Sequence, residues 1–156
     1  MNVFLDAPQD FANVCLVART LETLGVDHCY VHDPNRLIRD RYGKSRTSRI
    51  QKVSAGAFFQ INFERVEDPI RFLSELPGRK VATVPCQRAT PLTHFEFLPD
   101  DTILFGSEGR GISEELLSVC DTRLTIPQSG ITDSINLAVA VGIVLFENSR
   151  QATETI

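Results

Sequence analysis

Short apolar runs rich in β-branched residues alternate with longer amphipathic segments along the whole chain. Such alternation indicates repeated strand–helix units and predicts an α/β fold, with a mostly parallel sheet flanked by helices. Each strand candidate is bounded by Gly, Pro, Asp or Asn. The six candidates are Asn2 to Leu5, His28 to His32, Phe58 to Phe63, Lys80 to Val84, Thr102 to Phe105 and Arg123 to Ile126.

Three segments carry the spacing or end signals of amphipathic helices. Apolar residues recur every three or four positions in Asn13 to Leu24, and Gly25 marks the end of this helix. A second helix is predicted over Asp68 to Leu76. A third follows Ser113, whose hydroxyl is suited to capping a helix N-terminus.

A fourth helix is predicted to start at Ser134 and is apolar on all sides. Ten of the twelve residues from Ile135 to Phe146 are apolar. Twelve residues are too few for a membrane span, which needs about 20. The helix is therefore either a central core helix or half of a subunit interface. We expect residues 151–156 to fray.

Length, composition and cysteine spacing indicate one globular domain. The chain has 156 residues, of which 42% are hydrophobic and 23% charged, so we expect a single domain over residues 1–156. Its four cysteines lie far apart, and no signal-peptide pattern begins the chain. These features favour a reduced, cytoplasmic protein.

Basic residues are concentrated in one stretch, although the formal net charge is −4. Between Arg36 and Lys52, seven basic residues accompany a single acidic one, Asp40. The seven are Arg36, Arg39, Arg41, Lys44, Arg46, Arg49 and Lys52. The stretch is either a solvated surface segment or a contact for a polyanion such as RNA.

Glycines cluster at positions 106, 109 and 111, directly after the strand candidate Thr102 to Phe105. Ligands of α/β proteins bind at such strand ends. The spacing G-x-x-G-x-G differs from the dinucleotide fingerprint, which disfavours a dehydrogenase. Gly43-Lys44-Ser45 resembles half of a phosphate-binding loop, but Ile38 occupies the position of its required first glycine.

Metal and hydrolase patterns are not evident in the sequence. His28 and His32 would lie about 13 Å apart on a strand, too far to share one metal ion. The cysteines lack metal-ligand spacing, and no serine lies in a G-x-S-x-G motif. We therefore expect no metal cofactor.

Polar side chains stand at the start of two apolar helices. Ser134 and Asn136 begin the last one, and Asn13 and Arg19 lie on the first. Capping by Ser134, a loop contact of Asn136 and a surface or salt-bridged Arg19 would explain them structurally. A functional site is the alternative.

Three segments together resemble motifs one, two and three of the SpoU/TrmH family of SPOUT RNA 2′-O-methyltransferases. They are Pro8 to Thr20 (PQDFANVCLVART), Phe105 to Asp121 (FGSEGRGISEELLSVCD) and Ile126 to Asn136 (IPQSGITDSIN). Lys52 to Ala57 (KVSAGA) resembles the family's linker. The resemblance spans nearly the whole chain. It implies a C-terminal trefoil knot, S-adenosylmethionine as cofactor, and a homodimer that packs the first and last helices together.

The resemblance also implies roles for individual residues. The cofactor would contact Val84, Gly106, Glu108, Ile126, Ser134, Ile135 and Asn136. Arg19 would stabilise the developing alkoxide, because a guanidinium does not act as a simple base. Asn13, Ser134 and Asn136 would hold the arginine and the substrate phosphate. RNA phosphates would contact Arg110, Arg41, Lys44, Arg46 and Arg49.

Motif one departs from the family pattern N-x-G-N-x-G at Asp10, Ala12 and Cys15. Two functions therefore remain open. One is an RNA 2′-O-ribose methyltransferase, with tRNA ahead of rRNA as substrate. The other is a catalytically silent relative that binds RNA or S-adenosylmethionine. The enzyme is favoured by retained residues of all three motifs, namely Asn13, Arg19, Glu108 and Asn136.

Overall fold

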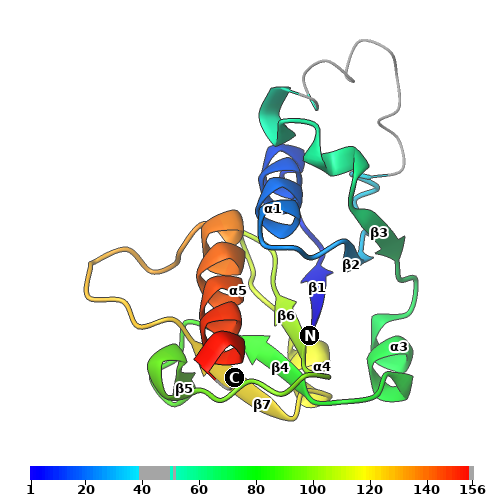
Figure 1. The fold of residues 1–156 in the computed structure, drawn as a ribbon. Coiled ribbons are helices and arrows are strands. Elements are labelled where there is room, and N and C mark those ends of the chain that lie inside the picture. The colour runs from blue at the N-terminus through cyan, green and yellow to red at the C-terminus, as the bar shows by residue number, and fades with distance from the viewer. Residues whose placement is uncertain (39–49, 51, 155–156) are drawn as a thin grey trace.

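Seven parallel strands form one sheet in the computed structural model, which describes residues 1–38, 50 and 52–154 (Figure 1). Their order across the sheet is β3-β2-β1-β6-β4-β7-β5. The strands are β1 (Asn2–Asp6), β2 (His28–His32), β3 (Asn62–Arg65), β4 (Lys80–Thr83), β5 (Thr90–Pro91), β6 (Thr102–Phe105) and β7 (Thr122–Thr125). The predicted α/β fold with a parallel sheet is confirmed, and the trefoil knot remains a prediction.

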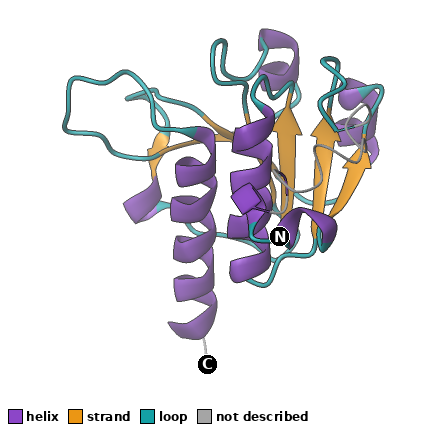
Figure 2. Ribbon diagram, turned by 90° about the horizontal axis from the view of Figure 1, so that it is seen from above, coloured by secondary structure: helices purple, strands orange, loops and turns teal. Residues whose placement is uncertain are grey.

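Helices cover both faces of the sheet because residues along each strand alternate between two cores. Val3 and Leu5 pack with α1 (Phe11–Thr23) and α5 (Leu137–Glu154), which lie side by side in Figure 2. Phe4 packs on the other face with α3 (Pro69–Glu75) and α4 (Glu114–Ser118). No helix within the described part of the chain is long and apolar enough to cross a membrane.

The strand predicted over Phe58 to Phe63 is wrong in its first half. Ala57–Phe59 forms a 3-10 turn, η1, and β3 begins at Asn62. Gly56 has a left-handed φ of 85°, and the buried Phe58 ring turns into an aromatic cluster with Phe11 and Phe63. These tertiary contacts override the apolar run that suggested a strand. The two-residue edge strand β5 was missed because Pro91 lies in it.

Both ends of α5 differ from the prediction. The helix begins at Leu137 instead of Ser134, because the Asn136 side chain accepts hydrogen bonds from the backbone N–H groups of Ala138 and Val139. At the other end it continues to Glu154, into the segment that we expected to fray, and residues 155–156 lie outside the described part of the chain. The Gln151 side chain holds this end by bonding to the backbone of residues 95 and 97.

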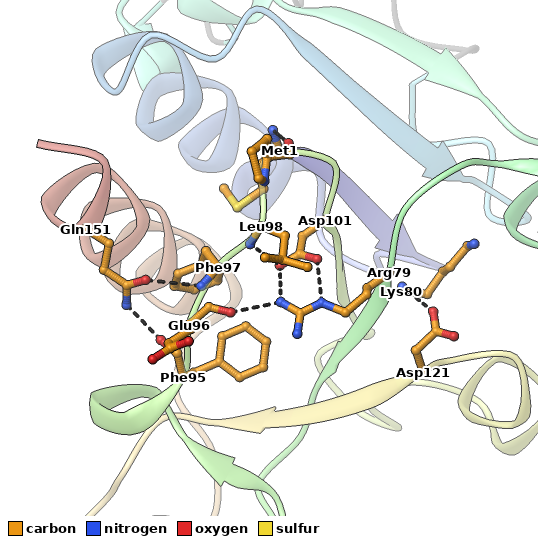
Figure 3. Close-up of polar contacts among 11 residues, drawn as sticks. Met1, Arg79, Lys80, Phe95, Glu96, Phe97, Leu98, Asp101, Asp121 and Gln151 are labelled. Carbon is orange, nitrogen blue, oxygen red and sulfur yellow. Dashed lines mark hydrogen bonds and ion pairs between the residues drawn. The ribbon is translucent and has the colours of Figure 1, made fainter. Parts of the chain in front are cut away.

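The C-terminal end of α5 rests on a strap formed by residues 95–101, drawn in Figure 3. Fully buried Asp101 accepts two hydrogen bonds from Arg79, of 2.8 and 2.7 Å, and one from the Leu98 N–H. The Arg79 guanidinium also donates to the Glu96 carbonyl and lies 5.3 Å from the Phe95 ring centre. The strap and α5 are thereby fixed to the sheet.

Candidate functional site

A pocket of about 430 Å³ opens at the carboxyl edge of the sheet, where ligands of parallel α/β proteins bind. Three loops and the start of α5 line it. The three loops follow β4, β6 and β7, whose carboxyl ends meet at this edge. The lining residues are Thr83, Val84, Pro85, Phe105 to Ile112, Ile126, Gln128, Asp133, Ser134, Ile135, Leu137 and Ala140.

The glycine cluster forms a tight turn that closes one side of the pocket. The backbones of Ser107 and Gly111 exchange two hydrogen bonds, of 3.1 and 2.9 Å. A Cβ on Gly106 would lie 2.0 Å from the carbonyl carbon of Gly111, and Gly111 itself has a φ of 68°. Glycine is therefore required at position 106 by close contact within the turn and at position 111 by the left-handed backbone.

Glu108 joins this turn to the N-terminal end of α1. Its carboxylate accepts hydrogen bonds from the backbone N–H groups of Gln9, at 2.9 Å, and Asp10, at 3.3 Å. The Asn13 amide donates a third, of 2.9 Å. Burial alone would raise the pKa of Glu108, but these bonds favour the charged form and together lower the pKa below its usual value.

Asn13 passes the connection on to α5. Its amide oxygen accepts a hydrogen bond of 3.0 Å from the Asn136 amide, while the Asn136 oxygen caps α5. Two side-chain hydrogen bonds therefore connect Glu108 to Asn13 and Asn13 to Asn136, which joins segments about one hundred residues apart in the sequence. The motif segments recognised in the sequence meet at this point.

The predicted cofactor residues fall into two groups. Six of them line the pocket, namely Val84, Gly106, Glu108, Ile126, Ser134 and Ile135. Asn136 is not among the lining residues, since its amide faces Asn13. Sequence reasoning missed most of the pocket wall, including Phe105, Ile112 and Ala140. Their positions beside the recognised glycines and at the start of the last helix were the available signal.

The structure describes only two of the predicted catalytic and RNA-binding cations, Arg110 and Arg19. Arg110 is exposed and lines the pocket. Arg19 is exposed on α1, and no contact with another described residue engages its guanidinium. The predictions for Arg41, Lys44, Arg46 and Arg49 lie outside the residues that the structure describes.

Two of the three departures in motif one, Asp10 and Cys15, have clear local surroundings. Asp10 caps α1 by accepting the Ala12 N–H at 2.9 Å, and its own N–H donates to Glu108. Cys15 is 2% exposed within the core.

Within the described ranges, no group of three or more His, Cys, Asp or Glu side chains could hold a metal ion.

Comparison with known proteins identifies relatives over most of the chain. A tRNA (guanosine(18)-2′-O)-methyltransferase of Aquifex aeolicus is 26% identical over 97% of this chain and 70% of its own length. A 23S rRNA (guanosine-2′-O-)-methyltransferase of Acinetobacter baylyi is 30% identical over 94% of this chain and 58% of its own. This chain therefore spans little more than half of some relatives.

Solved structures agree with this relationship. One that concerns 2-OH methylation of C/U34 on tRNA superposes with a TM-score of 0.82 at 29% identity, covering 98% of this chain and 96% of that one. An AdoMet-bound rRNA methyltransferase from Sinorhizobium meliloti superposes with a TM-score of 0.78 at 27% identity, covering 96% and 55%. The SpoU rRNA Methylase family model matches residues 1–146. The fold and the meeting of the three motifs agree with this match, and the chain belongs to that family.

Proposed function

We propose that this protein transfers a methyl group from S-adenosylmethionine to a ribose 2′-oxygen of RNA. The observation that carries the proposal is the pocket whose rim joins Glu108, Asn13 and Asn136. Membership of a methylase family supports the reaction class. The relatives named above act on guanosine 2′-oxygens in tRNA and rRNA, which supports RNA as the substrate.

The pocket suits a cofactor with a flat heteroaromatic ring and a positive sulfonium. Its volume lies within the 300–1,000 Å³ range of small-molecule sites. Val84, Ile126 and Leu137 offer apolar surface. The lining residues include two carboxylates, those of Glu108 and Asp133, and one cation, that of Arg110, so the pocket has a net negative charge. The lowered pKa of Glu108 keeps its negative charge at neutral pH. When bound, S-adenosylmethionine supplies an electrophilic methyl group.

Arg19 is the residue that we assign to the ribose oxygen. Methyl transfer forms an O–CH₃ bond as the S–CH₃ bond breaks, and the hydroxyl proton leaves for solvent or a nearby acceptor. An exposed guanidinium without another described partner is free to stabilise the alkoxide that develops. Asn13 and Asn136 join the N-terminal end of α1, the helix that carries Arg19, to the start of α5. Ser134 would contact the adjacent phosphate.

We place tRNA ahead of rRNA as the substrate class and expect a homodimer in the cytoplasm. The neighbouring structure on tRNA methylation, which this chain covers almost entirely, supports tRNA. Leu16 on α1 and Val139 and Phe146 on α5 are 39%, 52% and 63% exposed, which supports a partner subunit on these helices. The wide spacing of the four cysteines in the sequence agrees with a reducing compartment.

Phe146→Glu tests the dimer. Phe146→Glu places a charge on the exposed face, so we expect a folded monomer by sedimentation. A Phe146→Glu protein that still sediments as a stable dimer would remove this face from the interface.

Two titrations and one assay test the activity. We expect calorimetry to detect one S-adenosylmethionine site per subunit, with S-adenosylhomocysteine competing. Methyl transfer to a tRNA transcript should disappear in Arg19→Ala, whereas cofactor affinity stays within a few fold. Cofactor or RNA binding without any transfer by the unaltered protein would favour the catalytically silent alternative. Full turnover by Arg19→Ala would remove this residue from the mechanism.

A further inference from the structure

An aromatic ring stands exposed at the end of a cluster of packed rings. Phe58 is 4% exposed, with its ring centre 5.4 Å from that of Phe11 and 5.2 Å from that of Phe63. Its neighbour Phe59 meets it edge-on at 5.7 Å and is 44% exposed. The buried rings therefore support one side of Phe59 and leave the remainder of its surface to solvent.

The backbone just before Phe59 forms a turn of defined geometry. Ala55 and Gly56, just before η1, both have left-handed φ angles, of 52° and 85°. A non-glycine residue rarely adopts this conformation, and such strain tends to occur near functional positions. The turn is anchored by Ser54, whose buried hydroxyl donates to the Ile50 carbonyl at 2.7 Å. The ring is consequently presented by a fixed turn.

Phe59 follows the basic stretch by seven residues in the sequence, on a turn that packs near the N-terminal end of α1. The segment carrying η1 reaches the N-terminal end of α1 through the contact of Phe58 with Phe11, two residues before Asn13 (Figure 1). The chain that leads into η1 holds seven basic residues and one acidic residue between Arg36 and Lys52. Lys52 itself is exposed. The partner of this ring should therefore be a polyanion that also has flat apolar surfaces.

We infer that Phe59 stacks against an unpaired base of the RNA substrate, an inference that rests on the proposed function. Single-stranded RNA is held by bases stacked on aromatic side chains and by cations on its phosphates. The exposed apolar residues of α5 have a different pattern, since Val139 and Phe146 stand seven positions apart on one helix face. That stripe fits a second subunit, whereas Phe59 is a single exposed ring that follows the basic stretch in the sequence.

The absence of tryptophan from the sequence provides a direct probe. Phe59→Trp would carry the sole indole, and we expect its fluorescence to be quenched in a saturable manner by a tRNA transcript and by a short unstructured RNA. Phe59→Ala and Phe59→Leu should each raise the Kd of both RNAs at least about fivefold, because stacking on one ring contributes that much or more per base. Leu98→Ala is the matched control, with a similarly exposed side chain of 48% on the strap, and should leave the Kd unchanged.

Three outcomes would overturn the assignment. The first is an unchanged RNA Kd in Phe59→Ala when the unaltered protein binds tRNA. The second is full affinity in Phe59→Leu, which would exclude stacking in favour of a general apolar contact. The third is dissociation of the dimer by Phe59→Ala with normal RNA affinity, which would assign the ring to the subunit interface. Failure of the unaltered protein to bind either RNA would instead contradict the proposed function.

Discussion

The two ends of α5 are fastened by the same chemical group in different surroundings. At the N-terminal end, the exposed amide of Asn136 bonds to Asn13 at 3.0 Å on the rim of the pocket. At the C-terminal end, the half-buried amide of Gln151 bonds to the Phe95 carbonyl at 2.7 Å. This C-terminal end rests on the strap, which is held by the hydrogen bonds between Arg79 and the buried Asp101.

This difference in burial indicates that the C-terminal end of α5 contributes mainly to stability and the N-terminal end mainly to function. Hydrogen bonds within a protein interior are worth more than those exposed to water, and an unpaired buried group is costly. The C-terminal fastening should therefore carry most of the stability. The N-terminal fastening can be exchanged for water, so its value lies in where it holds Asn13 and Glu108.

Asp101→Asn should have the largest effect on the C-terminal end. It removes a buried charge that pairs with the partly exposed Arg79, and we expect the free energy of unfolding in urea to fall by about 3 kcal/mol. Cofactor affinity of the protein that remains folded should be unchanged. Loss of cofactor binding by a fully folded Asp101→Asn would show that the two ends of α5 are not separable.

Gln151→Ala should have a smaller effect at the same end. It leaves the Phe97 N–H and Phe95 carbonyl without their side-chain partner, so we expect a loss of about 1 to 2 kcal/mol. Hydrogen exchange should accelerate in the last turns of α5 and in the strap. If exchange accelerated equally at the start of α5, the helix would respond as one unit and the comparison would fail.

Two substitutions of Asn136 distinguish its cap from its link to Asn13. Asn136→Asp keeps the oxygen that caps α5 but loses the amide that donates to Asn13. We expect near-normal stability and at least a tenfold loss of methyl transfer. Asn136→Ala also loses the cap, so the free energy of unfolding should fall by about 1 kcal/mol more. Equal activity in Asn136→Asp and the unaltered protein would exclude a role for the link in transfer.

The pH dependence of Glu108 is the smallest expected effect. Because the folded state lowers the pKa of this carboxyl below 4.5, its contribution to stability is present above that value and is lost as pH falls through the folded pKa. Unfolding free energies of the unaltered protein and Glu108→Gln should therefore converge at acid pH. If the difference in unfolding free energy between the two proteins stayed the same down to acid pH, the charge of Glu108 would not be the source of its contribution to stability.

Periodicity and strand-end signals were sufficient for the fold class and most of the sheet. The strands β2 and β6 have the bounds that were predicted, because short apolar runs between turn residues leave few alternatives. The errors lie where distant contacts override local pattern. Phe58 turns out of a strand to reach Phe11, and α5 starts three residues late because Asn136 caps it.

The sequence by itself determined the parallel α/β architecture, the glycine turn and the family, since these depend on spacing within single segments. Only the tertiary structure decided that Glu108, Asn13 and Asn136 form one series, and that Asn136 faces Asn13. A hydrogen bond across 123 residues leaves no local signature, because its partners are set by how the sheet orders its strands and packs α1 against α5.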